Sequence, residues 1–203
     1  MKTQVLKKPS FEKLCRDIGL FLSASETQAY LMLPKSKQHD YLSGRYLLKQ
    51  CFAFMVKDEI NMTNVSISYE NNKPQIIYKS KTYPCSISHS KKYVACSIDE
   101  SGHTGIDVEE IRARTTEFQD YILPKDEAVY FSEDNGFMST QAWSIKEASF
   151  KADTKQRPLN EYVILGRKGD SFVVENSKTK WQIKVISRVI DNYIVSYTIP
   201  NTV

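Results

Sequence analysis

Three short segments hold most of the residues whose types and spacing could do chemistry. The first is Gly105-Ile106-Asp107-Val108-Glu109, in which hydrophobic and acidic residues alternate. On a β-strand this alternation puts Asp107 and Glu109 on one face, with Ile106 and Val108 on the other. Two neighbouring carboxylates repel each other unless a cation lies between them, and such oxygen ligands suit Mg²⁺, which also binds substrate phosphates. The alternative is a half-buried strand whose exposed face is acidic.

The second segment runs from Trp143 to Lys151 and reads Trp-Ser-Ile-Lys-Glu-Ala-Ser-Phe-Lys. Its residues Trp143, Glu147 and Lys151 are four apart, so they share one face of a helix. Glu147 is a candidate for a third carboxylate at a metal. The alternative is an ordinary surface pair of Glu147 and Lys151, which stabilises a helix by a few tenths of a kcal/mol.

The third segment, Ser86-Ile87-Ser88-His89-Ser90-Lys91-Lys92, is a polar cluster at the end of an expected strand. Hydroxyl groups and lysine ammonium groups are typical phosphate-binding groups. Ser88 and His89 are therefore candidates for contacts with phosphate. The alternative is that His89 is structural, since a histidine in a turn can hydrogen-bond the local backbone.

The composition describes a folded protein with a charge difference between its halves. Of the 203 residues, 41% are hydrophobic and 26% are charged, which is enough apolar material for a core. The length fits one large domain or two small lobes. Residues 1–99 carry 15 Lys and Arg against 8 Asp and Glu, whereas residues 100–203 carry 13 against 16. A basic first half indicates an anionic ligand, for which a nucleic acid, a nucleotide-like cofactor and an acidic protein all qualify.

The hydrophobic pattern predicts two α+β lobes. Helical spacing over residues 10–33, with a break near Ser23, is followed by a second helix from Pro34 to near Lys57. A period of two from Asn64 onward predicts an antiparallel meander. The expected strands of the first lobe cover residues 65–69, 74–78, 85–88 and 93–98. In the second lobe we expect a strand at 104–109, helices at 117–131 and 138–153 around a loop at 132–136, and strands at 162–167, 171–175, 181–186 and 193–198.

The sequence predicts neither a secreted nor a membrane protein. No segment combines a basic start, an apolar run and a small-residue cleavage site, and no apolar run approaches the ~18–20 residues that span a bilayer. The four cysteines form no CxxC pair and the three histidines are too few for a zinc site. We therefore expect reduced thiols, a cytoplasmic location and no membrane contact.

In their order and spacing, the three segments resemble the signature of the 4′-phosphopantetheinyl transferases, specifically the two-lobed surfactin-type subfamily. The most specific match is the Trp143–Lys151 segment, which fits the family pattern W-x-x-K-E-[AS]-x-x-K. Weaker matches lie at Gly44-Arg45-Tyr46-Leu47-Leu48 and Asn72-Lys73-Pro74, where family members often have GR-x-L-L and GKP. The resemblance covers about residues 34–155.

This resemblance implies two pseudo-symmetric lobes, residues 1–99 and 100–203, with the active site in the cleft between them. Each lobe would be a small, mainly antiparallel sheet packed with helix. The enzyme would transfer the 4′-phosphopantetheine group of coenzyme A to a serine of an apo carrier protein and release adenosine 3′,5′-bisphosphate, as a holo-[acyl-carrier-protein] synthase does. It would act as a monomer.

The resemblance also assigns the residues of the second lobe. Asp107, Glu109 and Glu147 would bind Mg²⁺, and Lys151 would neutralise the pyrophosphate. A metal ion and a lysine supply the charge neutralisation that phosphoryl transfer needs. The serine hydroxyl also needs a proton acceptor, for which Glu147 and a metal-bound water are alternatives. The role of Lys146, which matches the motif, stays open.

In the first lobe, the resemblance assigns residues to coenzyme A. Ser88 and His89 would contact the nucleotide phosphates, and Arg45 and Lys73 would hold the 3′-phosphate or the adenine side. Other N-terminal lysines have no firm alignment with the family.

The carrier protein is less defined by the resemblance. Where family members commonly have F-[ST]-x-x-E, this chain has Leu123-Pro124-Lys125-Asp126-Glu127, which keeps the Glu and loses the Phe and the hydroxyl. The corresponding segment helps to shape the carrier surface in the family. Acyl, peptidyl and polyketide carriers therefore all remain alternatives.

A function from another class is a non-catalytic module that binds anions or nucleic acid with the basic first lobe. The lysines do not alternate with aromatic residues as in known nucleic-acid motifs, and the acidic strand 105–109 would repel a phosphate backbone. We therefore expect no nucleic-acid partner.

Overall fold

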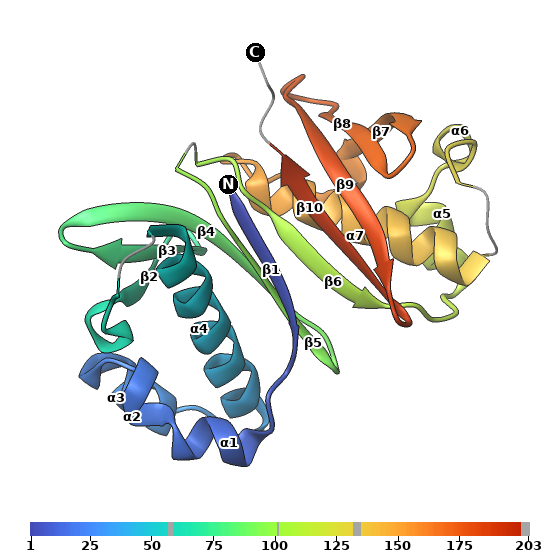
Figure 1. The fold of residues 1–203 in the computed structure, drawn as a ribbon. Coiled ribbons are helices and arrows are strands. Elements are labelled where there is room, and N and C mark those ends of the chain that lie inside the picture. Colours follow the sequence, from blue (N-terminus) through green and yellow to red (C-terminus); the bar gives the residue numbers. More distant parts are fainter. Residues whose placement is uncertain (57–58, 101, 132–134, 200–203) are drawn as a thin grey trace. The chain divides into compact units, whose positions relative to one another are not determined.

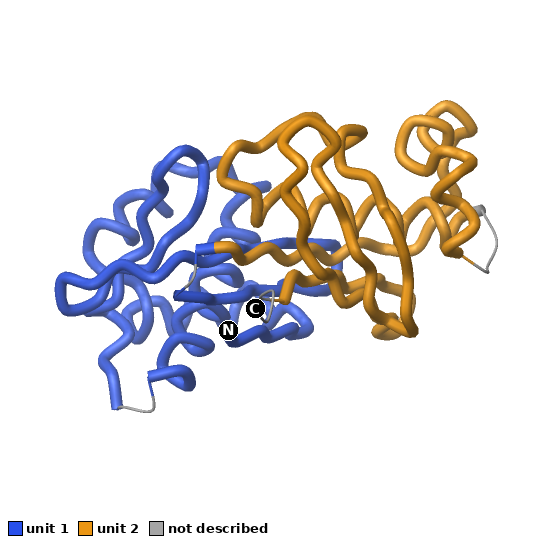
Figure 2. Tube along the Cα trace, turned by 90° about the horizontal axis from the view of Figure 1, so that it is seen from above, with its two compact units in different colours: residues 1–102 blue, residues 103–203 orange. Residues whose placement is uncertain are grey.

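The chain consists of two compact units, Met1–Gly102 (unit 1) and His103–Val203 (unit 2), which Figure 2 shows in different colours. The computed structural model describes residues 1–56, 59–100, 102–131 and 135–199. Each unit has helices and one five-stranded sheet (Figure 1), so the predicted α+β class is confirmed. The sequence analysis placed the boundary after residue 99, close to the observed one.

Unit 1 is an antiparallel sheet in the order β1-β5-β4-β3-β2, with one long helix. The predicted helix break near Ser23 is confirmed, because Ser23 caps α3 in a reciprocal capping box with Glu26. The strand β1, which was not predicted, pairs with β5. The elements are β1 (Lys2–Lys7), α1 (Phe11–Arg16), α2 (Ile18–Phe21), α3 (Ala24–Leu31), α4 (Lys35–Val56), a 3₁₀ turn (Met62–Asn64), β2 (Ser66–Glu70), β3 (Lys73–Tyr78), β4 (Lys81–His89) and β5 (Tyr93–Ile98).

Unit 2 has an antiparallel sheet in the order β6-β10-β9-β8-β7. The helix predicted over 117–131 is two helices, separated at Pro124, because proline disfavours helical backbone at the residue before it. The loop predicted at 132–136 falls partly on residues 132–134, which lie outside the described residues. The elements are β6 (Ile106–Glu110), α5 (Thr116–Ile122), α6 (Lys125–Ala128), α7 (Asn135–Ala152), a 3₁₀ turn (Leu159–Glu161), β7 (Tyr162–Lys168), β8 (Ser171–Asn176), β9 (Gln182–Ile190) and β10 (Tyr193–Ile199).

The two units share one topology. Each begins with a strand, continues through short helices into a long helix, and ends in a four-stranded meander whose last strand pairs with the first strand. In both, the long helix packs its apolar residues on the sheet: Leu48 and Phe52 of α4 on β5, and Ile145 and Ala148 of α7 on the strands of unit 2. The two units therefore repeat one order of helices and strands.

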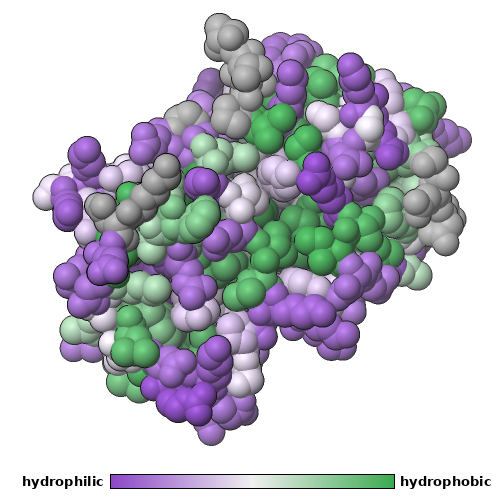
Figure 3. Space-filling view, viewed as in Figure 1, coloured by the Kyte–Doolittle hydropathy of each residue, from purple (hydrophilic) through white to green (hydrophobic). Residues whose placement is uncertain are grey.

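None of the described helices is long and apolar enough to cross a membrane. On the face that Figure 3 shows, hydrophobic side chains form separate patches among many polar ones.

Candidate functional site

The acidic residues of β6 face the long helix of unit 2. Asp107 is only 3% exposed, and its Oδ1 accepts a hydrogen bond from Lys151 Nζ of α7 at 2.9 Å. Glu109 lies two residues further along the same strand and is hydrogen-bonded by Trp143 of α7. Both carboxylates are thus on the helix side of the sheet, as the alternation predicted.

Lys151 lies among three oxygen acceptors. Its Nζ donates to Asp107 Oδ1 and, at 3.1 Å, to the backbone oxygen of Ile106. The Oε2 of Glu147, one helical turn away, is 3.9 Å from the same Nζ. The strongest contacts of Lys151 therefore lead to β6, and the interpretation as a simple surface pair with Glu147 does not describe them.

Glu109 extends this acidic cluster, which we define as Asp107, Glu109, Glu147 and Lys151. Its Oε2 is 3.4 Å from Nη2 of Arg114, and the Arg114 guanidinium lies 4.9 Å from the centre of the Phe118 ring. Phe118 in turn contacts the Trp143 ring, with 5.2 Å between the ring centres.

Burial raises the pKa of both glutamates in the acidic cluster. For Glu147 the neighbouring charges of Asp107 and Glu109 raise the pKa further, while Lys151 opposes the rise. For Glu109 the charge of Asp107 adds to the effect of burial, and Arg114 opposes it. The neighbouring carboxylates are thus close enough to disfavour the ionised form of Glu109 and of Glu147, which is the condition that a bound cation would relieve.

The side chains of the acidic cluster are not grouped as the ligands of a metal ion. Among the described residues, no three His, Cys, Asp or Glu side chains are grouped as metal ligands. Instead, the Lys151 ammonium lies beside Asp107 and Glu147. The donor set itself, three carboxylates with no nitrogen or sulfur ligand, has the chemistry that Mg²⁺ prefers.

Gly105 allows the close approach of α7 to β6. A Cβ atom at this position would lie 1.9 Å from the backbone oxygen of Ala148, closer than any real contact. The glycine therefore lets the helix that carries Glu147 and Lys151 lie directly against the strand that carries Asp107. In the sequence, Gly105 stands at the start of the 105–109 segment, but the sequence alone does not show that a close helix–strand contact requires a glycine there.

Lys146, whose role the sequence left open, is fully buried in an ion pair. Its Nζ donates to Glu127 Oε1 at 3.0 Å, and Glu127 Oε2 accepts from the backbone N–H of Ile164 at 3.1 Å. Burial lowers the pKa of Lys146 and raises that of Glu127, and the two charges oppose these changes. This pair ties α6, α7 and β7 together, which explains why the chain keeps Glu127 in a segment that departs from the family pattern.

Unit 1 brings Arg45 and His89 to one cavity of about 250 Å³. Lys37, Gly44 and Tyr41 also line it. A Cβ atom at Gly44 would lie 2.7 Å from Cε1 of His89, so the glycine makes room for the imidazole against α4. Asp40 lines the cavity too, so two cationic side chains and one carboxylate face it.

The other two predicted coenzyme A residues are not among the residues that line this cavity. Ser88 is a buried residue of β4, and Lys73 is the half-buried first residue of β3. Lys37, one of the lysines that have no firm alignment with the family, lines the cavity. Its position there becomes visible only once α4 is folded.

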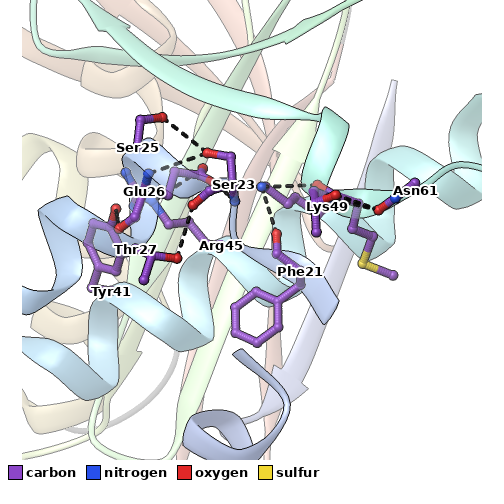
Figure 4. A network of polar contacts seen from close by, with 11 residues as sticks. Phe21, Ser23, Ser25, Glu26, Thr27, Tyr41, Arg45, Lys49 and Asn61 are labelled. Carbon is purple, nitrogen blue, oxygen red and sulfur yellow. Dashed lines mark hydrogen bonds and ion pairs between the residues drawn. The ribbon is translucent and has the colours of Figure 1, made fainter. Parts of the chain in front are cut away.

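Arg45 belongs to a buried polar network (Figure 4). Its Nε lies 3.5 Å from Glu26 Oε1, and its guanidinium lies 3.6 Å from the centre of the Tyr41 ring. Lys49, which is fully buried, hydrogen-bonds to Glu26 Oε2 and to the backbone oxygens of Phe21 and Met62. Burial lowers the pKa of Lys49, and Glu26 opposes this change. One carboxylate thus holds two cations, and Arg45 is fixed at the cavity wall.

Known proteins are similar to the part of the chain that contains the acidic cluster. Residues 103–198 match the model of the 4′-phosphopantetheinyl transferase superfamily. A holo-[acyl-carrier-protein] synthase of Mycoplasma mycoides subsp. mycoides is 34% identical over 73 residues, which is 36% of this chain and 66% of the relative. The corresponding protein of Mycoplasma capricolum subsp. capricolum is 33% identical with the same coverage.

A crystal structure of Thermotoga maritima holo-[acyl-carrier-protein] synthase also resembles part of the chain. The TM-score is 0.41 at 22% sequence identity, over 57% of this chain and 77% of the other.

Proposed function

We propose that this chain transfers the 4′-phosphopantetheine group of coenzyme A to a serine of an apo carrier protein, because residues 103–198 match the model of the 4′-phosphopantetheinyl transferase superfamily. The observation that supports this most strongly is the acidic cluster, in which three carboxylates and one lysine lie together within the matched region. The Mycoplasma relatives bear the name holo-[acyl-carrier-protein] synthase.

The reaction is a displacement at phosphorus. The serine Oγ of the carrier attacks the phosphorus that bears pantetheine, the new P–O bond forms, and the bond to adenosine 3′,5′-bisphosphate breaks. The serine proton leaves to a base, for which Glu147 with its raised pKa and a water molecule beside it are the candidates.

Asp107, Glu109 and Glu147 would hold Mg²⁺, since their oxygen ligands and mutual repulsion fit a divalent cation. When bound, the ion supplies charge neutralisation at the transferred phosphoryl group.

Lys151 would turn from Asp107 toward the phosphates. Its side chain is 24% exposed, so the ammonium can reach both the carboxylates and an incoming anion. A lysine ammonium on a flexible stem is a compact charge suited to this exchange. In the protein without ligand, the Lys151 ammonium partly neutralises the carboxylates of Asp107 and Glu147. With ligand bound, it would neutralise charge on the pyrophosphate.

We assign the nucleotide end of coenzyme A to the cavity of unit 1 that contains Arg45 and His89. Lys37, Arg45 and His89 line that cavity, and Glu26 and Tyr41 fix the orientation of the Arg45 guanidinium. Ser88 and Lys73 retain their predicted roles at the phosphates and at the adenine side as part of the same proposal. The surfactin-type subfamily, a monomeric state and a cytoplasmic location belong to it as well.

The direct test is incubation of the full chain with coenzyme A, Mg²⁺ and apo acyl, peptidyl or polyketide carrier proteins, read by intact mass spectrometry. The expected result is a carrier whose mass increases by one phosphopantetheine group and a matching amount of adenosine 3′,5′-bisphosphate. A chain that never modifies any of the carriers, but melts at a higher temperature with oligonucleotides in a salt-sensitive way, would instead be a nucleic-acid binder.

A further inference from the structure

The cavity of unit 1 contains a carboxylate that its proposed ligand does not explain. Asp40 of α4 lines this cavity together with Lys37, Arg45 and His89. The phosphates of coenzyme A would repel a carboxylate, because like charges at short range disfavour each other. The proposed transfer reaction gives Asp40 no role. We therefore expect Asp40 to face a part of the ligand that carries no negative charge.

Asp40 is held in its ionised form. Its Oδ1 accepts a hydrogen bond from Lys8 Nζ at 2.5 Å, and Oδ2 lies outside this contact. Burial disfavours the ionised form, but Lys8, His89 and His39 outweigh burial and lower the pKa of Asp40 below its ordinary value. The Asp40 side chain is 43% exposed. A ligand can therefore reach a charged acceptor oxygen.

Asp40 lies on the face of α4 that borders the cavity. It is one helical turn before Gly44, and residues four apart share a helix face. Gly44 is the residue whose missing Cβ makes room for the His89 ring. The charge of His89 also acts on the Asp40 carboxylate. The carboxylate and the imidazole are therefore directed to the same space.

Tyr69 provides an accessible aromatic ring at the same cavity. It follows Ile67 by two residues on β2, so both side chains lie on the face of the sheet that packs against α4. Ile67 belongs to the core there, whereas Tyr69 is 56% exposed. Tyr41, the other tyrosine in the lining, already lies against the Arg45 guanidinium. Tyr69 is in no ring–ring contact with any residue that the structure describes, so its ring can stack on a ligand.

We propose that Asp40 and Tyr69 recognise the adenine ring of coenzyme A, an inference that rests on the proposed function. Adenine is the only aromatic ring of coenzyme A, so it is the only part of that molecule that can stack on Tyr69. The exocyclic amino group of adenine donates hydrogen bonds and carries no negative charge. The face of the base stacks on Tyr69, and its amino group donates to Asp40 Oδ2. Lys37, an exposed cation of the same lining, is left to the phosphates.

The test separates recognition of the base from recognition of the phosphates. The full chain is titrated calorimetrically with adenosine 3′,5′-bisphosphate and with purine riboside 3′,5′-bisphosphate, in which a hydrogen atom replaces the amino group. We expect the adenosine compound to bind about tenfold more tightly, the effect of one charge-assisted hydrogen bond. Equal affinities would overturn the inference while the proposed function stands. A chain that binds neither bisphosphate nor coenzyme A would overturn both.

Asp40→Ala should remove this preference, so that the two bisphosphates bind with affinities within about twofold of each other. Lys8→Met is the matched control, because it breaks the same ion pair and keeps the carboxylate. It should retain the tenfold preference. If Asp40→Ala kept the preference, or if both variants lost it equally, Asp40 would act only through its contact with Lys8 and the proposal would be overturned.

Substitution of Tyr69 tests the stacking. Tyr69→Ala should weaken binding of adenosine 3′,5′-bisphosphate about tenfold, within the range for one base on an aromatic ring, and Tyr69→Phe should keep the affinity. Ribose 3,5-bisphosphate, which lacks the base, should bind to Tyr69→Ala and to the wild type alike. Tyr121→Ala removes an exposed tyrosine of α5 in unit 2 and should not change either affinity. A Tyr69→Ala variant that binds the adenosine compound normally, or that loses the same factor for the ribose compound, would overturn the proposal.

Discussion

The two units have the same order of helices and strands and an equivalent buried ion pair, but they differ in the charged side chains around it. In unit 1, Lys49 of the long helix is fully buried against Glu26 of the short helix before it. In unit 2, Lys146 of the long helix is fully buried against Glu127, which again lies on the short helix before it. In each unit the pair joins the short helix to the long helix. The correspondence indicates that these lysines belong to the frame, and not to the reaction.

The first strands of the units differ where they face the long helix. In β6 the residues toward α7 include Asp107 and Glu109. In β1 the corresponding face has Gln4 and Leu6, which pair with Cys96 and Val94 of the core under α4. The strand β1 therefore has no carboxylate at the positions that correspond to Asp107 and Glu109 of β6.

The long helices differ in the same direction. On α4, Lys37 and Arg45 line the cavity together with Asp40, whereas α7 presents Glu147 and Lys151 to an acidic strand. One topology thus carries different charged side chains on the long helix of each unit, as the proposed function requires of an anion site in unit 1 and a cation site in unit 2. A frame that is fixed by its core leaves the side chains at such positions free to differ.

The largest expected effect comes from breaking the shared buried pairs. Lys146→Met and Lys49→Met should each lower the free energy of unfolding by about 3–5 kcal/mol, because each leaves a buried carboxylate without its cation. Chemical denaturation measures this directly. The double variant Glu127→Gln/Lys146→Met keeps an acceptor for Ile164 and removes both charges, so it should recover most of the loss. If Lys146→Met lost transfer at unchanged stability, Lys146 would belong to the reaction and the comparison would fail.

The next effect tests the difference between the first strands. Asp107→Asn should lower single-turnover transfer on the order of 10³-fold, the upper range for the loss of one preorganised electrostatic contact, with the fold intact by circular dichroism. Glu109→Gln and Glu147→Gln should follow in the same direction. Gln4→Ala, on the corresponding face of β1, should keep the wild-type rate. An Asp107→Asn variant with full turnover at limiting Mg²⁺ would remove β6 from the metal site.

Substitution of Lys151 distinguishes a structural role of this residue from a catalytic one. Lys151→Ala should lower the transfer rate on the order of 10²-fold at saturating coenzyme A, because its ammonium would balance the charge on the pyrophosphate. The melting temperature should change little, and Lys151→Arg should restore only part of the rate. Lys155→Ala, an exposed control just beyond α7, should leave the rate unchanged. A destabilised Lys151→Ala variant with a normal rate would return this residue to a purely structural role.

Much of this arrangement could be predicted from local sequence, and the exceptions have physical causes. Alternation in 105–109 and the four-residue spacing in 143–151 predicted which side chains share a face, because strand and helix periods are local. The partners of Lys146 and Lys49 lie 19 and 23 residues away, and only tertiary packing brings them together. The strand β1 pairs with β5 across the whole of unit 1, so its short, charged sequence gave no local signal.

Gly105→Ala tests how closely α7 must approach β6. The new Cβ would meet the backbone of Ala148 at 1.9 Å, so the helix must move and the stability should fall by about 1–3 kcal/mol. Transfer should fall as well, since Glu147 and Lys151 move with the helix. Gly166→Ala is the matched control, because no atom lies within 4 Å of its added Cβ, and its stability should stay within about 0.5 kcal/mol of the wild type. Equal behaviour of the two variants would show that the close approach is not required.

The smallest expected effect is the pH dependence of stability in the metal-free protein. Burial and neighbouring charges raise the pKa of Glu147 and Glu109 above the ordinary value of 4.5. In the window between that value and the raised pKa, the folded protein holds protons that the unfolded chain has released. Stability is therefore complete below the ordinary pKa and falls as the pH rises through the raised pKa. Unfolding by denaturant in the presence of a chelator should show this fall, and Glu147→Gln should make it shallower. Excess Mg²⁺ should reverse this fall of stability in the wild type, because the ion favours the ionised carboxylates. If neither Glu147→Gln nor Mg²⁺ changed the pH dependence of the free energy of unfolding, the mutual repulsion on which the proposed metal site depends would be contradicted.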